Sequence, residues 1–526
     1  MGLALEMLPH LNQSTATSVL RNIFAYRIML MNKMQMQTKI LLCAFPGLWV
    51  ARSYAPTNVW FLVPIAIAIW WAAVHKRGLF DYVFFAFFYS FVFWFVHLYW
   101  LEIVGVDAFI GLAIIMSLIY MLCGFLMFLV KDLPLPYVWY ALIFISLETA
   151  TDYLPFGGFP WGKIAYVSAD APWANLFSIG SAPLVSAAIL TISILLIKAY
   201  EFFIKKSFSP AVLILIVILA FNISINQVYS FSELSKGKID LAIIQGSTPR
   251  SGLLFNEQKM EVLNYHVAET NRLFARNNKN IDLILWPENS IDVDPFKNEV
   301  ALKSIKSILS SHGKPLLSGA VLQGKKGLSN TVLLWNPDSQ TVQDSYVKSK
   351  LVPFGEYLPY REVLTKYIKR FELIPQDFIP GGEANNIAIG KAIISPIVCY
   401  EIAWNNSLFD QIEQGGQLIS VHTNNATYVF SQQLDQQFMI TRIRAMETAR
   451  EVVVTSTTGI SAHINNSGEV LWQSKIFAPD SKVVSASLYN EITPAVRYRN
   501  EISLIGLWGW LLPMVFLVIR YFYRKK

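Results

Sequence analysis

The sequence predicts a two-part fold, in which a bundle of about eight membrane-spanning helices carries an extramembrane α/β domain. Three observations lead to this prediction. Of the 526 residues, 54% are hydrophobic and only 15% are charged, whereas soluble domains carry about a quarter charged residues. Several long segments contain no Asp, Glu, Lys or Arg. One polar block, residues 233–500, separates most of these segments from a last one near the C-terminus.

The membrane part is predicted from the uncharged apolar runs, because a helix needs roughly 20 apolar residues to cross the bilayer core. The runs before the polar block are residues 40–51, 53–74, 82–101, 108–130, 133–147, 175–197 and 208–232, and residues 502–519 follow it. The runs at 40–51 and 133–147 are short for a span. The predicted parts are an N-terminal extension at residues 1–38, a bundle at 39–232, the α/β domain at 233–500, and a final helix with a basic tail at 501–526.

The net charge of +7 fits membrane topology better than nucleic-acid binding. Basic residues gather at the ends of alternate apolar runs, for example Lys76 with Arg77 and Lys205 with Lys206. Loops rich in Lys and Arg stay on the cytoplasmic side of a membrane. The polar block is therefore predicted outside the cytoplasm. Because no basic stripe accompanies a soluble fold, the sequence predicts no nucleic-acid partner.

The polar block alternates short apolar runs with segments of helical spacing. The runs that predict buried strands are residues 239–245, 281–286, 315–322, 331–335, 392–398, 417–421 and 452–456. The segments that predict helices are residues 256–276, 299–309 and 432–450. Strands that alternate with helices predict a layered α/β domain.

Three polar features follow apolar strands in this block. They are Glu288, the pair Lys348 and Lys350, and Cys399, the one cysteine of the polar block. Each has an ordinary structural explanation by itself, as a capping carboxylate, a solvated lysine face and a small buried thiol. Together they form a complete set for acyl transfer, since a carboxylate takes the proton of a thiol and an ammonium stabilises the thiolate and the oxyanion. No His/Cys cluster has the spacing of metal ligands, so the sequence predicts neither a metal nor another cofactor.

These motifs resemble the carbon–nitrogen hydrolase (nitrilase) superfamily and, within it, the apolipoprotein N-acyltransferase family. The matching segments are WPE at residues 286–288, YVKSKLVPFGEYLP at 346–359 and CYE at 399–401. GGFPWG at 157–162 resembles the GFPW element in the membrane half of that family. The resemblance covers nearly all of the chain after the N-terminal extension. It implies a nitrilase-like α-β-β-α sandwich for the polar block.

The resemblance also implies roles for individual residues. Cys399 would be the nucleophile, Glu288 the general base and Lys348 the oxyanion stabiliser, with Lys350 the weaker match for that lysine. The supporting residues would be Glu356, Tyr400 and Glu401. The positions expected to contact substrate are Trp161, Phe255, Asn424 and Tyr428.

Five positions, in three places, depart from the pattern of that family. The segment 424–428 is NNATY where NDAWF is common. Phe255 stands where a Trp is usual, and Gln437 where a His is usual before the RIRAME element at 442–447. These departures leave the Glu–Lys–Cys set intact and concern the loops around the substrate.

In the implied reaction, Cys399 takes a fatty acyl chain from a phospholipid, and the α-amine of the diacylglyceryl-cysteine of an apolipoprotein then attacks the thioester. The expected partners are this phospholipid donor, the diacylglyceryl-modified apolipoprotein acceptor and the membrane itself. The expected location is the bacterial inner membrane, with the α/β domain on the periplasmic face.

Other kinds of protein account for the sequence less well. A membrane-tethered amidase of the nitrilase type, in which water resolves the thioester, would share the catalytic residues, but an anchor needs only one helix. A non-catalytic scaffold would have no use for the Glu–Lys–Cys set. A transporter is disfavoured because the apolar runs lack paired charges near their middles.

Overall fold

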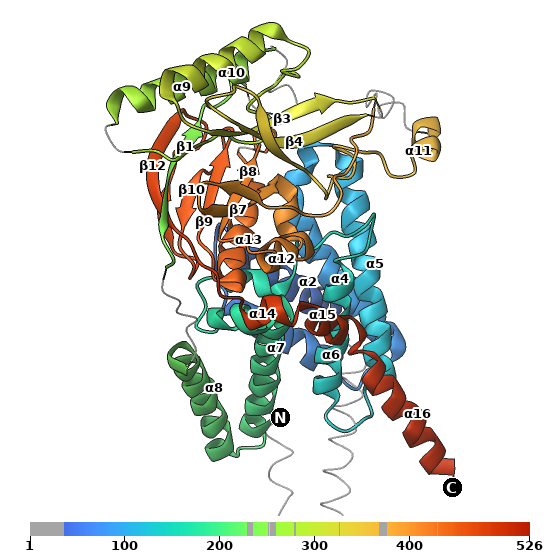
Figure 1. Cartoon of the computed structure of the whole chain (residues 1–526). Coiled ribbons are helices and arrows are strands. Elements are labelled where there is room, and N and C mark those ends of the chain that lie inside the picture. Colours follow the sequence, from blue (N-terminus) through green and yellow to red (C-terminus); the bar gives the residue numbers. More distant parts are fainter. Residues whose placement is uncertain are drawn as a thin grey trace, which may run out of the picture.

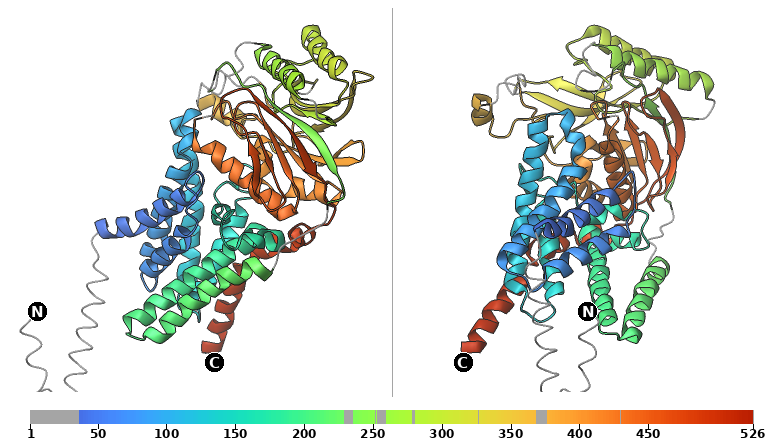
Figure 2. Two further views of the ribbon diagram at one scale, coloured as in Figure 1. Left: turned by 90° about the vertical axis from the view of Figure 1, so that its left-hand side faces the viewer. Right: turned by 180° about the vertical axis from the view of Figure 1, so that it is seen from behind.

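The computed structural model describes residues 36–228, 235–250, 252, 259–277, 280–325, 327–367, 376–428 and 430–525. Phe255 and nearly all of the predicted extension at residues 1–38 lie outside these residues. In Figure 1 the α/β part lies above the helical part, with α9 and α10 farthest from the bundle and α8 and α16 at the opposite end. Both views of Figure 2 show the sheets between the α9–α10 pair and the helical bundle.

Each apolar run of the sequence overlaps a helix in the described part of the chain. Before the α/β part these helices are α2 (Met36–Ser53), α3 (Leu62–Val74), α4 (Leu79–His97), α5 (Val106–Val130), α6 (Pro136–Ala150), α7 (Phe177–Ile204) and α8 (Phe208–Val228). Between them lie the short 3-10 helices η2 (Tyr99–Ile103), η3 (Ile164–Val167) and η4 (Ala174–Leu176). The chain closes with α14 (Pro494–Arg497), α15 (Arg499–Trp508) and α16 (Leu511–Lys525).

The predicted count of about eight spans is not confirmed. Among the described residues, three helices are long and apolar enough to cross a membrane by length and composition, and these are Leu79–His97, Val106–Val130 and Ala174–Ile204. The pair α15 and α16, bent by 45°, adds a fourth if it is one span. Local backbone breaks shorten the others. Asn58 has a positive φ of 55° before α3, and Leu135 one of 54° before α6, and such residues do not continue a right-handed helix.

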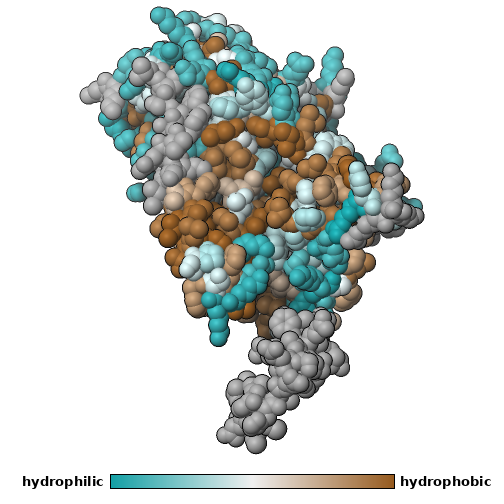
Figure 3. Space-filling model, turned by 90° about the horizontal axis from the view of Figure 1, so that it is seen from below, coloured by the Kyte–Doolittle hydropathy of each residue, from teal (hydrophilic) through white to brown (hydrophobic). Residues whose placement is uncertain are grey.

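Large apolar side chains are exposed along the helical part. On α5 they recur every three or four residues, at Ile110, Ile114, Leu118, Leu122, Phe125 and Leu129. Figure 3, which looks at the molecule from below, shows broad hydrophobic areas broken by smaller hydrophilic patches. An exposed apolar surface of this extent is unusual for a soluble monomer, and it is expected where lipid replaces water.

The α/β part contains two six-stranded sheets, with the orders β12-β1-β2-β3-β4-β5 and β11-β10-β9-β8-β7-β6. The strands of the first sheet are β1 (Lys238–Gln245), β2 (Leu283–Leu285), β3 (Leu316–Gln323), β4 (Leu328–Trp335), β5 (Val342–Val347) and β12 (Asp480–Ser487). Those of the second are β6 (Ile387–Ile389), β7 (Ala392–Val398), β8 (Leu418–Thr423), β9 (Val452–Ser456), β10 (Ala462–Ile464) and β11 (Val470–Gln473). The central strands β1–β2–β3 and β7–β8–β9 are parallel.

The two sheets are the inner layers of an α-β-β-α sandwich. Leu241 and Ile243 of β1 enter the core between the sheets, whereas Ala242 and Ile244 face the other way, toward α9 (Glu261–Arg276) and α10 (Glu299–His312). This alternation follows the pleat of a strand that is buried on both faces. The outer face of the second sheet packs on α12 (Asn406–Glu413) and α13 (Gln432–Thr448).

The α12–α13 layer shares one hydrophobic core with the helical bundle. Arg444 of α13 is fully buried at this junction. Its guanidinium donates to the carbonyl oxygens of Ile402 (2.8 Å) and Ala403 (2.7 Å) and to the Tyr166 hydroxyl (3.2 Å), and it pairs with Glu447. Because every partner is close, the buried charge is compensated. The residue therefore joins α13 to the bundle and to the η6 turn (Cys399–Ala403).

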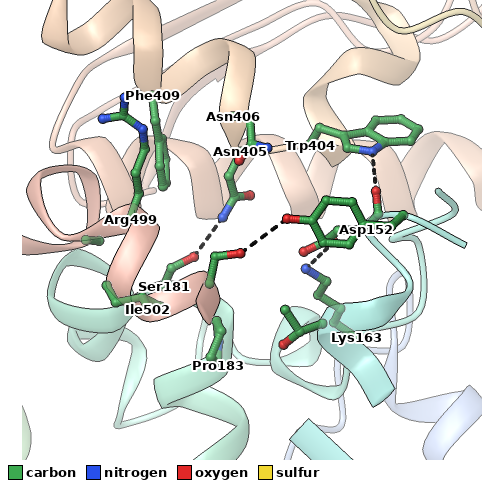
Figure 4. A pocket seen from close by; sticks show the side chains of 14 residues that line it. Asp152, Lys163, Ser181, Pro183, Trp404, Asn405, Asn406, Phe409, Arg499 and Ile502 are labelled. Carbon is green, nitrogen blue, oxygen red and sulfur yellow. Dashed lines mark hydrogen bonds and ion pairs between the residues drawn. The ribbon is translucent and has the colours of Figure 1, made fainter. Parts of the chain in front are cut away.

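A small polar pocket of about 40 Å³ lies at the same junction (Figure 4). The Asp152 carboxylate pairs with Lys163 at 2.5 Å, and the backbone oxygen of Asp152 accepts from Trp404 Nε1 at 3.2 Å. Asn405 Nδ2 donates to Ser181 Oγ at 3.0 Å. The pocket has room for water rather than for a lipid, and its polar groups connect the bundle to the segment after the η6 turn.

Two glycines of α5 provide a matched test of how the bundle packs. A Cβ at Gly124 would lie 2.4 Å from the Tyr82 carbonyl oxygen and 2.7 Å from the Ala86 Cβ of α4, whereas a Cβ at Gly111 would meet nothing within 4 Å. We expect Gly124→Ala to decrease the free energy of unfolding by about 1–3 kcal/mol through overpacking. This decrease should appear as a lower thermal midpoint of the detergent-solubilised protein. Gly111→Ala should leave the midpoint unchanged or raise it, since Ala favours helix by about 1 kcal/mol over Gly. Equal midpoints for the two variants would contradict the α4–α5 contact.

Candidate active site

The three predicted catalytic side chains come together beyond the ends of strands. Glu288 follows β2, Cys399 directly follows β7, and Lys348 directly follows β5. Since parallel strands β2 and β7 lie in facing sheets, their carboxyl ends bring loops from both halves of the sandwich to one place. Glu288 and Cys399 follow the predicted apolar runs at 281–286 and 392–398, whereas β5 before Lys348 contains three polar residues.

The ammonium of Lys348 is buried between two carboxylates. Its side chain is 1% exposed, and Nζ lies 3.3 Å from Glu288 Oε1 and 2.9 Å from Glu356 Oε1. Burial alone would lower the pKa of Lys348, but the two carboxylates raise it above its ordinary value. The side chain therefore stays positively charged in a site from which water is largely excluded.

Asn330 holds both of these carboxylates. Its Nδ2 donates to Glu288 Oε1 at 2.7 Å and to Glu356 Oε1 at 3.0 Å. The second oxygen of Glu288 accepts from the Asn424 amide at 2.8 Å, and that of Glu356 accepts from the Val352 amide at 2.8 Å. Asn330 was not among the residues predicted from the sequence. It precedes the predicted apolar run at 331–335 and lies between Ser329 and Thr331, so no pattern in the sequence distinguished it.

Glu401 connects the nucleophile turn to the lysine segment. Its carboxylate accepts from the amides of Val398 (2.9 Å), Ser349 (2.6 Å) and Lys350 (3.0 Å). The Ser349 hydroxyl (2.8 Å) and the Tyr346 hydroxyl (3.0 Å) also donate to it. This set of bonds fixes the two segments relative to each other, so the predicted supporting role of Glu401 has a physical basis in positioning.

The Cys399 thiol is protonated at rest. Burial and the negative charge of Glu288 raise its pKa, Lys348, the Thr423 side chain and the Asn424 amide lower it, and the net result is a pKa of about 12. The backbone of Cys399 has a positive φ of 52°, a strained conformation for a residue with a side chain. The arrangement provides a thiol, a carboxylate to receive its proton and a fixed ammonium, which is what nucleophilic acyl transfer requires.

An apolar cavity of about 330 Å³ opens beside the thiol. Its walls come from α5, from the GFPW segment and from the turn at residues 352–355, and they include Leu112, Ile115, Phe159, Trp161, Tyr400 and Tyr428 beside Cys399. The volume lies within the range of cavities that hold small ligands. Because the lining is mostly hydrocarbon, the cavity fits an aliphatic ligand.

The residues predicted to contact substrate are distributed as follows. Trp161 and Tyr428 line the apolar cavity, and Trp161 stacks on Tyr400 with 5.8 Å between ring centroids. Asn424 contacts Glu288 through its backbone amide. Phe255 lies outside the described residues. The roles of all four in substrate binding stay predictions.

Gln436 of α13 is a second residue that the sequence did not single out. Its Oε1 accepts the indole N–H of Trp161 at 2.8 Å and that of Trp100 at 3.0 Å, and its Nε2 donates to the His97 carbonyl oxygen at 3.1 Å. Both indoles line the apolar cavity. One amide thus sets the orientation of two of its largest side chains. The neighbouring Gln437, noted for its departure from the family, lies with Nε2 4.0 Å from Cys399 Sγ.

Among the described residues, no group of three or more His, Cys, Asp or Glu side chains is arranged to hold a metal ion. The acidic side chains of the site are instead engaged with Lys348 and with amide donors.

The chain matches known families in both halves. Residues 241–496 match the family model described as carbon–nitrogen hydrolase, and residues 23–195 match the N-terminal domain of apolipoprotein N-acyltransferase. An apolipoprotein N-acyltransferase from Mycolicibacterium smegmatis is 30% identical, over 86% of this chain and 80% of that protein. One from Photobacterium profundum is 23% identical, over 91% of this chain and 95% of that protein.

Solved structures of the nitrilase superfamily are similar to about half of this chain. A mutant of the Nesterenkonia sp. AN1 amidase, of the nitrilase superfamily, is 16% identical and covers 52% of this chain and 97% of that chain, with a TM-score of 0.37. The family match at 241–496 defines the α/β part as a carbon–nitrogen hydrolase domain. With its N-terminal half included, the chain belongs to the apolipoprotein N-acyltransferase family. It is therefore an acyltransferase and a membrane protein.

The charges around the thiol predict how Cys399 reacts with iodoacetamide. Below its pKa of about 12, the alkylation rate should rise about tenfold per pH unit, because only the thiolate reacts. Glu288→Gln removes a charge that raises the pKa and should speed alkylation, whereas Lys348→Met should slow it. Timed mass spectrometry of the Cys399 peptide between pH 7 and 10 measures this, with the fully buried Cys43 as internal control. A rate independent of pH would mean that the thiol is already ionised.

The two indole bonds predict a large effect of Gln436→Leu. This change leaves two buried N–H groups without an acceptor, at about 1–3 kcal/mol each. We expect a clear fall in the thermal midpoint of the purified protein. Gln432→Leu, on the half-buried first residue of the same helix, is the matched control and should change the midpoint little. Equal decreases in the thermal midpoint of the two variants would show that Gln436 does not stabilise the cavity wall.

Proposed function

We propose that this enzyme transfers a fatty acyl chain from a phospholipid, through a thioester on Cys399, to the α-amine of the diacylglyceryl-cysteine of an apolipoprotein. The observation that supports this most strongly is the place of the thiol. Cys399 borders an apolar cavity of about 330 Å³ whose walls include residues of the membrane-part helix α5. A nucleophile in this position meets an acyl chain that arrives from the lipid.

The first half-reaction uses the charges around the thiol. Glu288 takes the thiol proton, and the thiolate attacks the ester carbonyl carbon of the phospholipid. Lys348 stabilises the tetrahedral oxyanion, since its ammonium is fixed and desolvated. The C–O bond then breaks, and the leaving lysophospholipid oxygen takes the proton back from Glu288. The acyl chain remains on Cys399 as a thioester.

The second half-reaction repeats this chemistry with an amine. The α-amine of the acceptor attacks the thioester carbonyl, Lys348 again faces the oxyanion, and Glu288 receives the ammonium proton. Collapse of the tetrahedral intermediate breaks the C–S bond, forms the amide and releases the thiolate. Glu288 then returns its proton to the thiolate. The two substrates use the site in turn, so the kinetics should be ping-pong.

The membrane arrangement is part of this proposal. It keeps the division into residues 1–38, 39–232, 233–500 and 501–526, with about eight spans, on the basis that every apolar run overlaps a helix in the described part of the chain. The basic loops support an α/β domain outside the cytoplasm, which in this proposal lies on the periplasmic face of the bacterial inner membrane. The phospholipid donor and the modified apolipoprotein would then reach the site from the outer leaflet.

The proposal predicts an acyl adduct on Cys399 when the pure enzyme meets phospholipid micelles without acceptor. Intact-protein mass spectrometry should show one added acyl group that mild hydroxylamine removes, because thioesters are labile to it. Cys399→Ser should show no hydroxylamine-labile adduct. Cys43→Ser, which changes a buried thiol of α2, is the matched control and should keep the adduct.

A diacylated lipopeptide then separates transfer from hydrolysis. The transferase converts the lipopeptide to its N-acylated form at the expense of the adduct. Fatty acid released with the lipopeptide unchanged would favour the amidase-like alternative, in which water resolves the thioester. An unmodified enzyme with the lipid unconsumed would contradict the proposed function.

A further inference from the structure

A second cavity adjoins the apolar one. Its volume is about 400 Å³, and the two cavities share Phe156, Gly158 and Pro353 as walls. On its far side it is bordered by Lys350 and Tyr357. A ligand whose reactive carbonyl lies at the thiol therefore has a neighbouring space beyond the shared wall.

Most polar groups around this second cavity already have partners. The Asp377 carboxylate pairs with Arg361 and accepts from the Leu358 amide at 3.0 Å. Ser349 Oγ donates to Glu401 at 2.8 Å, and the Tyr357 hydroxyl donates to the Phe156 carbonyl oxygen at 2.8 Å. These groups leave no net negative charge to attract a cation.

Lys350 is the exception within the described part of the chain. Its backbone amide is held by Glu401 at 3.0 Å, but its half-buried ammonium has neither a carboxylate nor a hydrogen-bond acceptor among the described residues. Lys348, two residues earlier, is fully engaged with Glu288 and Glu356. The two lysines of one motif thus have different surroundings: Lys348 is paired with carboxylates, and Lys350 borders the second cavity, where it is available to an anion.

We propose that the second cavity holds the phosphate of the donor phospholipid, with the Lys350 ammonium as its counter-charge. The proposal rests on the function proposed above. In a glycerophospholipid the ester carbonyl and the phosphate are joined by the short glycerol backbone. When the acyl chain occupies the apolar cavity and its carbonyl lies at Cys399, the phosphate reaches the adjoining space. A phosphate oxygen and an ammonium form a strong, charge-assisted hydrogen bond.

This assignment explains how one site distinguishes two lipids. The diacylglyceryl-cysteine of the acceptor carries acyl chains on glycerol, as the donor does, but it has no phosphate. A positive charge beside the thiol therefore strengthens the binding of the phospholipid donor in the first half-reaction. It does not strengthen the binding of the acceptor. Lys350 is a specificity residue in this scheme, separate from the charges that act on the thiol.

The test is a binding experiment on the full chain in detergent with lipids that cannot react. The binding of dialkyl ether phosphatidylglycerol is compared with that of the dialkylglycerol with the same chains. Binding is measured by the change in the tryptophan fluorescence of the protein. We expect Lys350→Glu to weaken phosphatidylglycerol binding about tenfold or more, as loss of a charge-assisted bond would, and to leave dialkylglycerol binding unchanged. Lys350→Arg should restore most of the phospholipid affinity.

Lys391→Glu is the matched control, because it makes the same charge change at an exposed turn at the opposite end of β7 from Cys399. It should leave both affinities unchanged. Unaltered phosphatidylglycerol binding by Lys350→Glu, or an equal loss for dialkylglycerol, would overturn the proposal. If Lys350→Glu weakens the binding of inorganic phosphate but not that of the phospholipid, the second cavity is a site for free phosphate. This result would also overturn the proposal.

The acyl-adduct experiment distinguishes failure of this proposal from failure of the proposed function. If wild type forms no adduct but ether phospholipid binding still depends on Lys350, the acyl-transfer mechanism is wrong and the phosphate site stands. If wild type and Lys350→Glu form the adduct at the same rate from limiting phospholipid, the mechanism stands and the phosphate site is wrong.

Discussion

The active site depends on one buried charge, the ammonium of Lys348. A charge without a partner in a protein interior costs several kcal/mol, so the fold has to bring anions to it. Glu288 comes from the end of β2 and Glu356 from the turn after β5, and Asn330 of β4 binds both. The other oxygen of Glu288 is held by an amide that follows β8 of the second sheet. The hydrogen bonds and ion pairs around the Lys348 ammonium therefore involve residues from both sheets.

The same charges determine the state of the nucleophile. Burial and Glu288 keep the Cys399 thiol protonated, so the thiolate forms only when a base takes its proton. The strained backbone at Cys399 is held on one side by Glu401 and on the other by Arg444, which binds the carbonyl oxygens of the η6 turn. The reactivity of the Cys399 thiol therefore depends on these neighbouring groups rather than on exposure to solvent.

Helix α13 joins the chemistry to the membrane part. It is an outer layer of the sandwich, and it shares a core with the bundle. Arg444 on this helix anchors the nucleophile turn, and Gln436 orients two indoles in the wall of the apolar cavity. The apolar cavity is therefore lined by residues from both parts of the chain.

The sequence by itself determined the strands of the sheet centres, the helices of the bundle, and Glu288, Lys348 and Cys399 as a set, because apolar runs and the residues that end them are local features. No range was predicted for β5, β6, β10, β11 or β12, because these strands are short or alternate apolar with polar residues. The count of about eight spans is not confirmed, because three helices of the described residues, or four with the bent α15–α16 pair, are long and apolar enough to cross a membrane. Only the tertiary structure decided which loops meet. The contacts of Asn330 and Gln436, the apolar cavity, and the separation of Lys348 from Lys350 all join segments far apart in the chain, and no local pattern records such contacts.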